Sequence, residues 1–343
     1  MDAPKVLKNT KKKIRVDFER TNLGDRMKAK YASLAFAGKI AWKIFRLVLL
    51  IGISYIILFP FFSKISGSFM SREDLVDVTV RLIPKYPTLD TYKYIIRENG
   101  YFSAFVNTFL LSTMCAFVQT FICAIIGYGL AKFKFRGNKL VFALVIFTMI
   151  VPHETIKLSM YMNFKFFDVF GLYGMLNNAL HFSETGFIDL TNTYWPMFIL
   201  SIGGIAFKNG LYIFMMRQFF KGVPDELEEA AYIDGESTFG TFFKIILPIS
   251  IPMMITIFIF AFAWQWTDNF YTDLFFTKTD AALMPKIVKV PTSLSDDSFE
   301  AQALYESCIK NTCGLMIILP LILFYSYLQR YLIQGIERSG IVG

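Results

Sequence analysis

Long apolar stretches without charge alternate along this chain with shorter polar stretches. A helix of about 20 mostly apolar residues crosses the hydrocarbon core of a bilayer. Six stretches reach or approach this length, so the pattern predicts an all-α polytopic membrane protein with six transmembrane helices. The predicted spans are residues 44–63, 105–131, 140–161, 194–216, 245–267 and 311–331.

The composition agrees with this class of protein. Hydrophobic residues make up 55% of the 343 residues, and charged residues make up 18%. A soluble domain has about 25% charged residues. Charge is therefore scarce, as expected for a chain that places most of its length in lipid.

Positive charge gathers before the first predicted span. Residues 1–46 hold 13 Lys or Arg and four Asp or Glu, which gives this segment a net charge of +9. The whole chain has a net charge of +8, so the remaining residues together carry −1. A nucleic-acid partner and an anionic lipid surface both suit such a segment. We favour lipid, with no nucleic acid, because positive charge beside a first span stays cytoplasmic and orients it. We expect residues 1–43 to form a basic cytoplasmic segment before a six-span domain over residues 44–343, with no cleavable signal peptide.

The loops between the spans carry a matching asymmetry. Residues 132–139 include four basic residues and no acid, which indicates the cytoplasmic side. Residues 63–104, 161–193 and 268–310 are then expected outside, and both termini inside. The inner loop 218–244 is net acidic, which suggests a protein partner for it.

Neither metal binding nor catalysis is indicated. The four cysteines lack the paired spacing of zinc ligands and are interpreted as small apolar residues, with a bridge between Cys308 and Cys313 left open. Only two histidines occur in the chain, and His153 with Glu154 fits no catalytic pattern. We expect no catalytic residue, no metal site and no cofactor in this chain.

The acidic inner loop has the features of a short helix. Pro224 suits a first helical turn, and the acidic residues after it favour the positive end of the helix dipole. Leu227, Ala230 and Ala231 are spaced to form a narrow apolar face, and Gly235 can end the helix in the left-handed conformation. Such a helix of two to three turns is either a solvated linker or a docking element, since it is too short to be stable alone.

The spacing of fixed residues in this loop favours docking. Glu229-Ala230-Ala231, three residues, Gly235, nine residues and Ile245-x-Leu247-Pro248 follow one another. This pattern resembles the EAA loop of permease subunits of ABC-type importers. The flanking Arg217-Gln218-Phe219-Phe220 and Ile233-Asp234-Gly235 resemble the carbohydrate-uptake, maltose-type branch, and the resemblance covers roughly residues 45–343.

The resemblance implies a type I ABC importer permease fold in the bacterial plasma (inner) membrane, and a transport component rather than an enzyme. It also implies four kinds of partner: a second homologous permease, two copies of an ATP-binding subunit that holds ATP and Mg²⁺, an extracytoplasmic sugar-binding protein, and membrane lipid. No phosphate-binding Gly-x4-Gly-Lys-Ser/Thr loop occurs here. The residues expected to dock the ATPase are Glu229, Ala230, Ala231, Asp234, Gly235, Leu247 and Pro248.

Candidates for the substrate path lie in the fourth predicted span and at the end of the fifth. Charged groups at membrane depth are costly and often functional, and aromatic rings beside amides and carboxylates suit sugars. The candidates are Lys208, Trp264, Gln265, Trp266, Asp268 and Asn269. Lys208 could instead snorkel or pair within the bundle, and the aromatic residues could form an interfacial belt.

Other functions remain as alternatives at this point. An ion-coupled secondary transporter should show several intramembrane acids and inverted repeats, and few such acids occur here. A membrane enzyme would need clustered His, Asp or Glu. An ABC importer for a solute other than a sugar is a further alternative. The sequence names neither the sugar nor the permease subunit that binds it, and it assigns no role to the lengthened segment 181–193.

Overall fold

The computed structural model describes residues 34–168, 171–180, 186–278, 282–296 and 298–338. These residues are mostly helical, and no strand occurs among them beyond one isolated bridge between Phe167 and Ile188. The chain divides into two compact units, residues 1–63 and 64–343, which are described separately. Residues 1–33 of the predicted basic segment lie outside the described residues.

Helix α2 (Leu34–Gly67) corresponds to the first predicted span and extends beyond both of its ends. None of its most apolar 18-residue window is buried, and its large apolar side chains from Ile40 to Ile65 are exposed. Exposed apolar surface of this length fits a helix that faces lipid or another subunit.

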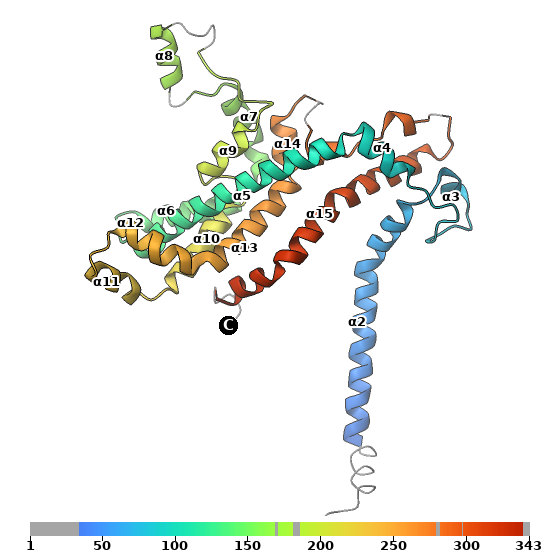
Figure 1. Ribbon diagram of the computed structural model, residues 1–343, viewed down its shortest axis with the longest axis horizontal. Helices are drawn as coiled ribbons and strands as arrows, with labels where there is room; N and C mark the ends of the chain where they lie inside the picture. Colours follow the sequence, from blue (N-terminus) through green and yellow to red (C-terminus); the bar gives the residue numbers. More distant parts are fainter. Residues whose placement is uncertain (1–33, 169–170, 181–185, 279–281, 297, 339–343) are drawn as a thin grey trace, which may run out of the picture. The chain divides into compact units, whose positions relative to one another are not determined.

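Four helices form the centre of the second unit. They are α5 (Tyr101–Lys132), α10 (Asn209–Lys221), α13 (Leu247–Trp266) and α15 (Gln302–Arg338). The most extensive contacts join α5 with α13, α5 with α10, and α13 with α15, and Figure 1 shows α5, α13 and α15 side by side. The second and sixth predicted spans are therefore long helices, as predicted.

The fifth predicted span begins earlier than expected. Helix α12 (Thr238–Thr241) and a π-helical turn, η2 (Phe242–Ile246), lead directly into α13, so the apolar segment runs from Thr238. The Leu247 amide donates to the Phe242 carbonyl, a bond that spans five residues. Pro248 has no N–H for the regular pattern, and a π turn just before it accommodates that loss.

The third and fourth predicted spans are not continuous helices, which corrects the prediction for 140–161 and 194–216. The third is α6 (Asn138–Ile150), followed by η1 (His153–Ile156) and α7 (Lys157–Lys165), with a bend of 94°. Pro152 lies at this bend and removes a backbone donor there.

The fourth predicted span is divided by a six-residue loop. Helix α9 (Trp195–Ile202) ends before the loop 203–208, and α10 begins after it. Gly204 has φ of +67°, a conformation that L-residues rarely adopt, so the helix cannot continue through it. Among the described residues, four continuous helices are long and apolar enough to cross a membrane, or five if α6 and α7 count as one span.

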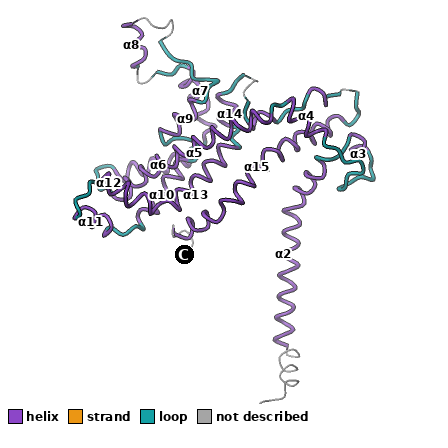
Figure 2. The backbone as a smooth tube through the Cα atoms, viewed as in Figure 1, coloured by secondary structure: helices purple, strands orange, loops and turns teal. Residues whose placement is uncertain are grey.

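Shorter elements make up the rest of the described helical residues. They are α3 (Arg72–Val76), α4 (Asp90–Glu98), α8 (Leu172–Leu180), α11 (Glu226–Ile233), α14 (Phe270–Phe275), η3 (Met284–Ile287) and η4 (Thr292–Leu294). Helices α11 and α12 lie at one end of α5 and α4 lies at the other, joined by loops (Figures 1 and 2).

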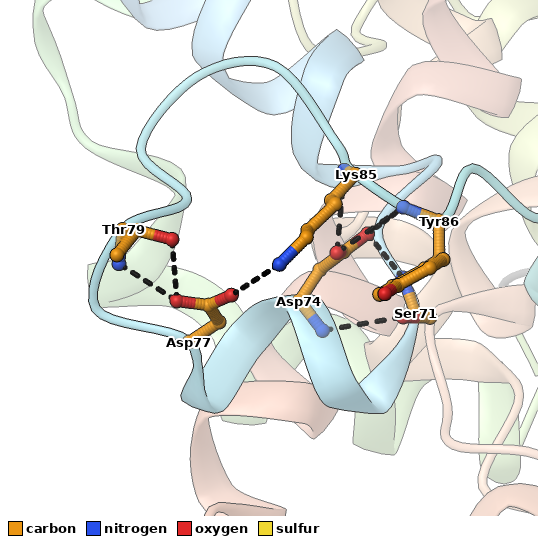
Figure 3. A network of polar contacts seen from close by, with 6 residues as sticks. All are labelled: Ser71, Asp74, Asp77, Thr79, Lys85 and Tyr86. Atoms are coloured by element: carbon orange, nitrogen blue, oxygen red, sulfur yellow. Dashed lines mark hydrogen bonds and ion pairs between the residues drawn. The ribbon is translucent and has the colours of Figure 1, made fainter.

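The segment after α2 is held by carboxylates (Figure 3). Asp74 is 2% exposed and accepts from the amides of Lys85 and Tyr86, while Ser71 and Asp74 cap each other's backbone. Asp77 accepts from Thr79 and pairs with Lys85. These contacts satisfy the buried Asp74 carboxylate and fix the shape of the loop.

Two of the predicted outer segments contact each other through one arginine. Arg72 forms an ion pair with Asp296 at 3.0 Å and donates to the Leu294 carbonyl at 3.0 Å. Its guanidinium also lies over the rings of Phe299 and Tyr305. The described parts of these two predicted outer segments therefore contact each other at Arg72, as expected for two loops on one side of the membrane.

A glycine sets how closely α5 and α10 pack. A Cβ built at Gly127 would lie 2.6 Å from the Met216 Cβ and 3.0 Å from the Arg217 amide nitrogen. Small residues let helix backbones approach in this way. Gly127→Ala should destabilise the protein by about 1–3 kcal/mol because the two helices must separate.

The measurement is thermal unfolding of the detergent-purified protein. Gly129→Ala, two residues away on the same helix, is the matched control, since its nearest neighbour is a flexible Phe133 atom at 3.9 Å. It should be neutral or stabilising by up to about 1 kcal/mol. Equal effects of the two variants would contradict the packing assignment.

Candidate functional site

Helix α11 forms where the acidic loop was predicted to be helical. Its first turn carries Glu226, Glu228 and Glu229, as the helix dipole favours. At its end the Gly235 amide donates to the Tyr232 carbonyl, and the Glu236 amide donates to the Ala231 carbonyl. Gly235 has φ of +84°, so the predicted left-handed end is confirmed as a Schellman motif.

The buried face of α11 differs from the predicted apolar face. Glu228 and Ala231 are buried, at 8% and 3% exposed, whereas Leu227 is 39% exposed and Ala230 is also exposed. Residues three apart share a helix face, so Glu228 and Ala231 turn toward the rest of the chain. Glu229 and Ala230 remain exposed on the outward side.

A lysine at the end of α5 holds this helix in place. The Lys132 ammonium donates to the Val223 carbonyl at 2.7 Å and to the Asp225 carboxylate at 2.5 Å, and lies 3.6 Å from the Glu228 carboxylate. The Lys132 side chain is only 7% exposed. One buried cation therefore joins a central helix to both the start and the inner face of α11.

The two carboxylates around Lys132 differ in environment. Burial raises the pKa of Glu228 above its ordinary value, and the Lys132 ammonium opposes that rise. The hydrogen bond from Lys132 lowers the pKa of Asp225, which is exposed. The Lys132 ammonium is the cation that stabilises the charged form of the buried Glu228 carboxylate. Removing Lys132 would leave that carboxylate buried without a partner, so Lys132 is needed for the stability of this site.

Sequence analysis counted Lys132 only as a topological signal and missed this role. It also missed two exposed apolar side chains, Ile233 at 85% and Phe239 at 79%. Both lie in a loop that is predicted to be cytoplasmic. A large apolar side chain that is exposed there indicates a surface that contacts a partner.

The remaining residues predicted for docking divide into two groups. Asp234 and Gly235 are exposed at the end of α11, beside Glu229 and Ala230. Leu247 instead packs against the main hydrophobic cluster at the start of α13. Glu229, Ala230, Asp234, Gly235, Ile233 and Phe239 therefore form an exposed surface, called here the α11 surface.

A cavity lies where both broken spans are interrupted. Its volume is about 390 Å³, and its lining includes Pro152 and His153 from the first break and Ala206, Phe207 and Lys208 from the second. Irregular backbone at membrane depth is tolerated where it is buried in protein or lines a cavity. The two interruptions thus line one cavity.

A second cavity of about 210 Å³ shares Ala206, Phe207, Lys208 and Phe270 with the first, so the two adjoin at Lys208. Five of the six residues predicted for the substrate path line it, namely Lys208, Trp264, Gln265, Asp268 and Asn269. Tertiary structure therefore brings together candidates from the fourth and fifth predicted spans.

Trp266 lies elsewhere, which corrects its assignment to the path. Its side chain is 1% exposed, and its indole nitrogen donates to the Ile317 carbonyl at 2.9 Å. The ring packs against Phe105 and Phe262. Trp266 lies two residues from Trp264 and so points to another side of α13, where it joins α13 to α15.

Two polar residues at the smaller cavity already have partners. Asp268 accepts from the amides of Tyr271 and Thr272, at 3.2 and 3.1 Å, and so caps the start of α14. Gln265 donates weakly to the Met197 sulfur at 3.5 Å. Sequence analysis missed Tyr212 and Tyr271, which also line this cavity and are almost fully buried.

Comparison with known proteins identifies the class of this chain. Residues 95–338 match the family described as the binding-protein-dependent transport system inner membrane component. The chain belongs to this family. It is an inner-membrane permease component of a binding-protein-dependent importer, and the family is a transport family, so the chain is not an enzyme. An ion-coupled secondary transporter is thereby set aside.

Named relatives of this permease transport carbohydrates. One is the polygalacturonan/rhamnogalacturonan transport system permease protein YtcP of Bacillus subtilis, 26% identical over 83% of this chain and 92% of YtcP. Another is the arabinooligosaccharides transport system permease protein AraQ of Bacillus subtilis, 26% identical over 89% of this chain and 96% of AraQ.

A solved structure shares the fold. It is a bacterial ABC transporter involved in the import of the acidic polysaccharide alginate, with a TM-score of 0.62 and 19% identity, covering 86% of this permease and 97% of that chain. The ABC importer permease fold expected from the sequence is therefore shown. The family also implies an ATPase and a substrate-binding protein as partners of this permease.

The four cysteines of the permease are free. Cys115, Cys123 and Cys313 are buried, and Cys308 is partly exposed. The question of a bridge between Cys308 and Cys313 is thus answered against one, and both occupy α15 as ordinary helix residues.

Removing the Lys132 cation should loosen α11. Lys132→Met keeps an unbranched apolar stem but leaves the buried Glu228 carboxylate without its partner, which should destabilise the permease by about 3 kcal/mol. Adding Glu228→Gln removes that carboxylate and should recover part of the loss. Thermal unfolding in detergent measures both variants.

Lys134→Met is the matched control, because Lys134 is exposed in the same loop. It should change the unfolding midpoint little, as exposed charges contribute little to stability. A Lys132→Met protein as stable as this control would show that the buried cation does not hold α11.

Proposed function

We propose that this permease forms half of the translocation path of an ATP-driven importer for a carbohydrate, with an oligosaccharide as its substrate class. The observation that supports this most directly is the pair of adjoining cavities at the two broken spans. Their lining combines the aromatic rings of Phe207 and Trp264 with the amide of Gln265 and the cation of Lys208. Rings stack on the C–H faces of sugars, and polar groups bind their hydroxyls.

The relatives support carbohydrate but leave its charge open. By name, the alginate importer acts on an acidic polysaccharide, YtcP on polygalacturonan and rhamnogalacturonan, and AraQ on arabinooligosaccharides. These proteins are only distantly similar to this permease. The choice between acidic and neutral substrates therefore depends on the cavity itself.

For topology, we propose six membrane crossings with both termini in the cytoplasm. The bent pair α6–α7 would form the third crossing, and α9 with α10 would form the fourth. Broken helices of this kind occur in transporters where the break lines a substrate cavity. The basic segment 1–43 would then face the cytoplasm and anionic lipid, before the permease domain 44–343.

For coupling, we propose that the α11 surface docks on the ATPase. Its exposed Ile233 and Phe239 offer apolar contact, and Glu229 offers charge to basic groups. Leu247 and Pro248 would act less directly, by fixing the angle at which the loop enters α13. The proposed assembly adds a second homologous permease, two ATP-binding subunits that hold ATP and Mg²⁺, and the extracytoplasmic sugar-binding protein.

The fold suggests how docking reaches the cavity. A displacement of α11 would be carried through Lys132 to α5, which packs along both α10 and α13. These three helices line or flank the adjoining cavities. ATP binding would then favour one of two arrangements of the permease, as a ligand does in any two-state system.

Reversing one charge on the α11 surface tests the docking proposal. Glu229→Lys should leave the permease folded, because Glu229 is exposed. It should reduce ATPase co-purification and ATP-dependent uptake by about tenfold, since a like charge at a docked interface is strongly unfavourable.

Glu73→Lys is the control, as Glu73 is also exposed but belongs to a predicted outer loop. Its ATPase co-purification should match the wild type. Equal ATPase recovery from both variants would remove the docking role from Glu229.

Cysteine labelling tests the proposed sidedness. In a background lacking the four native cysteines, Val78→Cys should react with a membrane-impermeant maleimide in right-side-out vesicles, because Val78 is 90% exposed in a proposed outer loop. Ser237→Cys, exposed beside α11, should react only after permeabilisation. The reverse pattern would invert the topology.

A further inference from the structure

Lys208 stands out among the cations of this permease. Its ammonium lies 4.6 Å from the ring centres of both Phe207 and Trp264. Among the described residues, no carboxylate lies within ion-pair distance of it. Two rings thus contact a positive charge that belongs to the lining of both cavities.

The acids around these cavities do not neutralise Lys208. Glu154 lines the larger cavity but pairs with Lys157 at 3.9 Å. Asp268 lines the smaller cavity, and its two carboxylate oxygens are taken by the Tyr271 and Thr272 amides. Lys208 is therefore a cation at both cavities that has no carboxylate at ion-pair distance, while these two acids are engaged by other groups.

Position in the helix adds to this positive potential. Lys208 is the N-cap residue of α10, a helix of 13 residues. The first amides of a helix have no intrahelical partner and carry the positive end of its dipole. Half-helix N-termini in broken spans face anionic substrate groups in other transporters.

Two buried hydroxyl groups at the same cavity lack partners. Tyr212 is 1% exposed and Tyr271 is 3% exposed, and neither hydroxyl has a hydrogen-bond partner among the described residues. Both residues line the smaller cavity with Lys208. Buried hydroxyls are normally satisfied, so each indicates an absent polar ligand or water.

We propose that these groups form a subsite for an acidic sugar unit, a hexuronate, in the translocation path. The substrate carboxylate would bind the Lys208 ammonium, and the ring hydroxyls would bind Tyr212 and Tyr271. The exposed face of Trp264, which is 51% exposed, would cover the C–H face of the sugar. The subsite rests on the proposed carbohydrate function and specifies its substrate class.

The chemistry favours a uronate over other anions. One ammonium matches one carboxylate, whereas a phosphate group carries up to two charges and usually meets several cations or an Arg fork. A bare inorganic anion offers no C–H face for the indole ring of Trp264 to contact. A pyranose ring offers both a C–H face for the indole and hydroxyl groups for Tyr212 and Tyr271. A charged sugar is also the ligand that gains most from a cation held at membrane depth.

The test uses pairs of probes that differ only at C6. The complete importer in lipid nanodiscs is titrated with galacturonate and galactose, and with glucuronate and glucose, and binding is followed by saturation-transfer NMR. At least one uronate should bind about tenfold more tightly than its neutral partner, because a charged hydrogen bond replaces a neutral one. Lys208→Met should abolish this preference, and Lys208→Arg should restore much of it.

Lys278→Met is the control, since Lys278 is exposed in a predicted outer segment, and it should keep the preference. Equal binding of charged and neutral probes, no uronate binding, or a preference that survives Lys208→Met would overturn the subsite. Uptake is measured separately in proteoliposomes with the binding protein and ATP. Uronate uptake that is unchanged in Lys208→Met would refute the subsite alone, whereas no carbohydrate uptake at all would refute the carbohydrate proposal as well.

Discussion

Backbone groups that cannot hydrogen-bond to lipid constrain this permease more than any other factor. Regular helices satisfy them in α5, α13 and α15, and these helices pack together as its centre. Two predicted spans break this rule, at Pro152 and at the loop 203–208. Both breaks line the same cavity, and irregular backbone is tolerated at membrane depth where it lines a cavity. The cavity is thus a consequence of where helical hydrogen bonding stops.

The opposite end of the central helices is organised by one buried cation. Lys132 draws the start and inner face of α11 onto α5, so the remaining face of α11 is presented outward as a rigid surface. Rigidity matters for transmission because a loosely held helix would absorb a partner's movement. Helix α5 runs from Lys132 back to Phe105, whose ring packs on Trp266 of α13. One continuous helix therefore connects α11 to the other end of the central helices.

Charge is distributed differently at these two places. Around Lys132 the ammonium is hydrogen-bonded to Asp225 and lies at ion-pair distance from Glu228, and these contacts join α5 to α11. Around Lys208 the rings of Phe207 and Trp264 hold the ammonium without neutralising it. A cation that is held in position without a carboxylate partner can bind an anionic group of a ligand. This contrast separates a lysine that builds the fold from a lysine suited to the substrate path.

The sequence by itself determined the class, the approximate place of every apolar segment, and the short acidic helix that ends at Gly235, because helix length in lipid and helix-end chemistry are local properties. It could not show that spans 140–161 and 194–216 break, since broken halves keep the same composition. It joined Trp266 to the path with Trp264, although a helix turns them to different sides. Only the tertiary structure paired Lys132 with Glu228 and gathered Lys208, Trp264 and Tyr271, because these contacts join residues far apart in the chain.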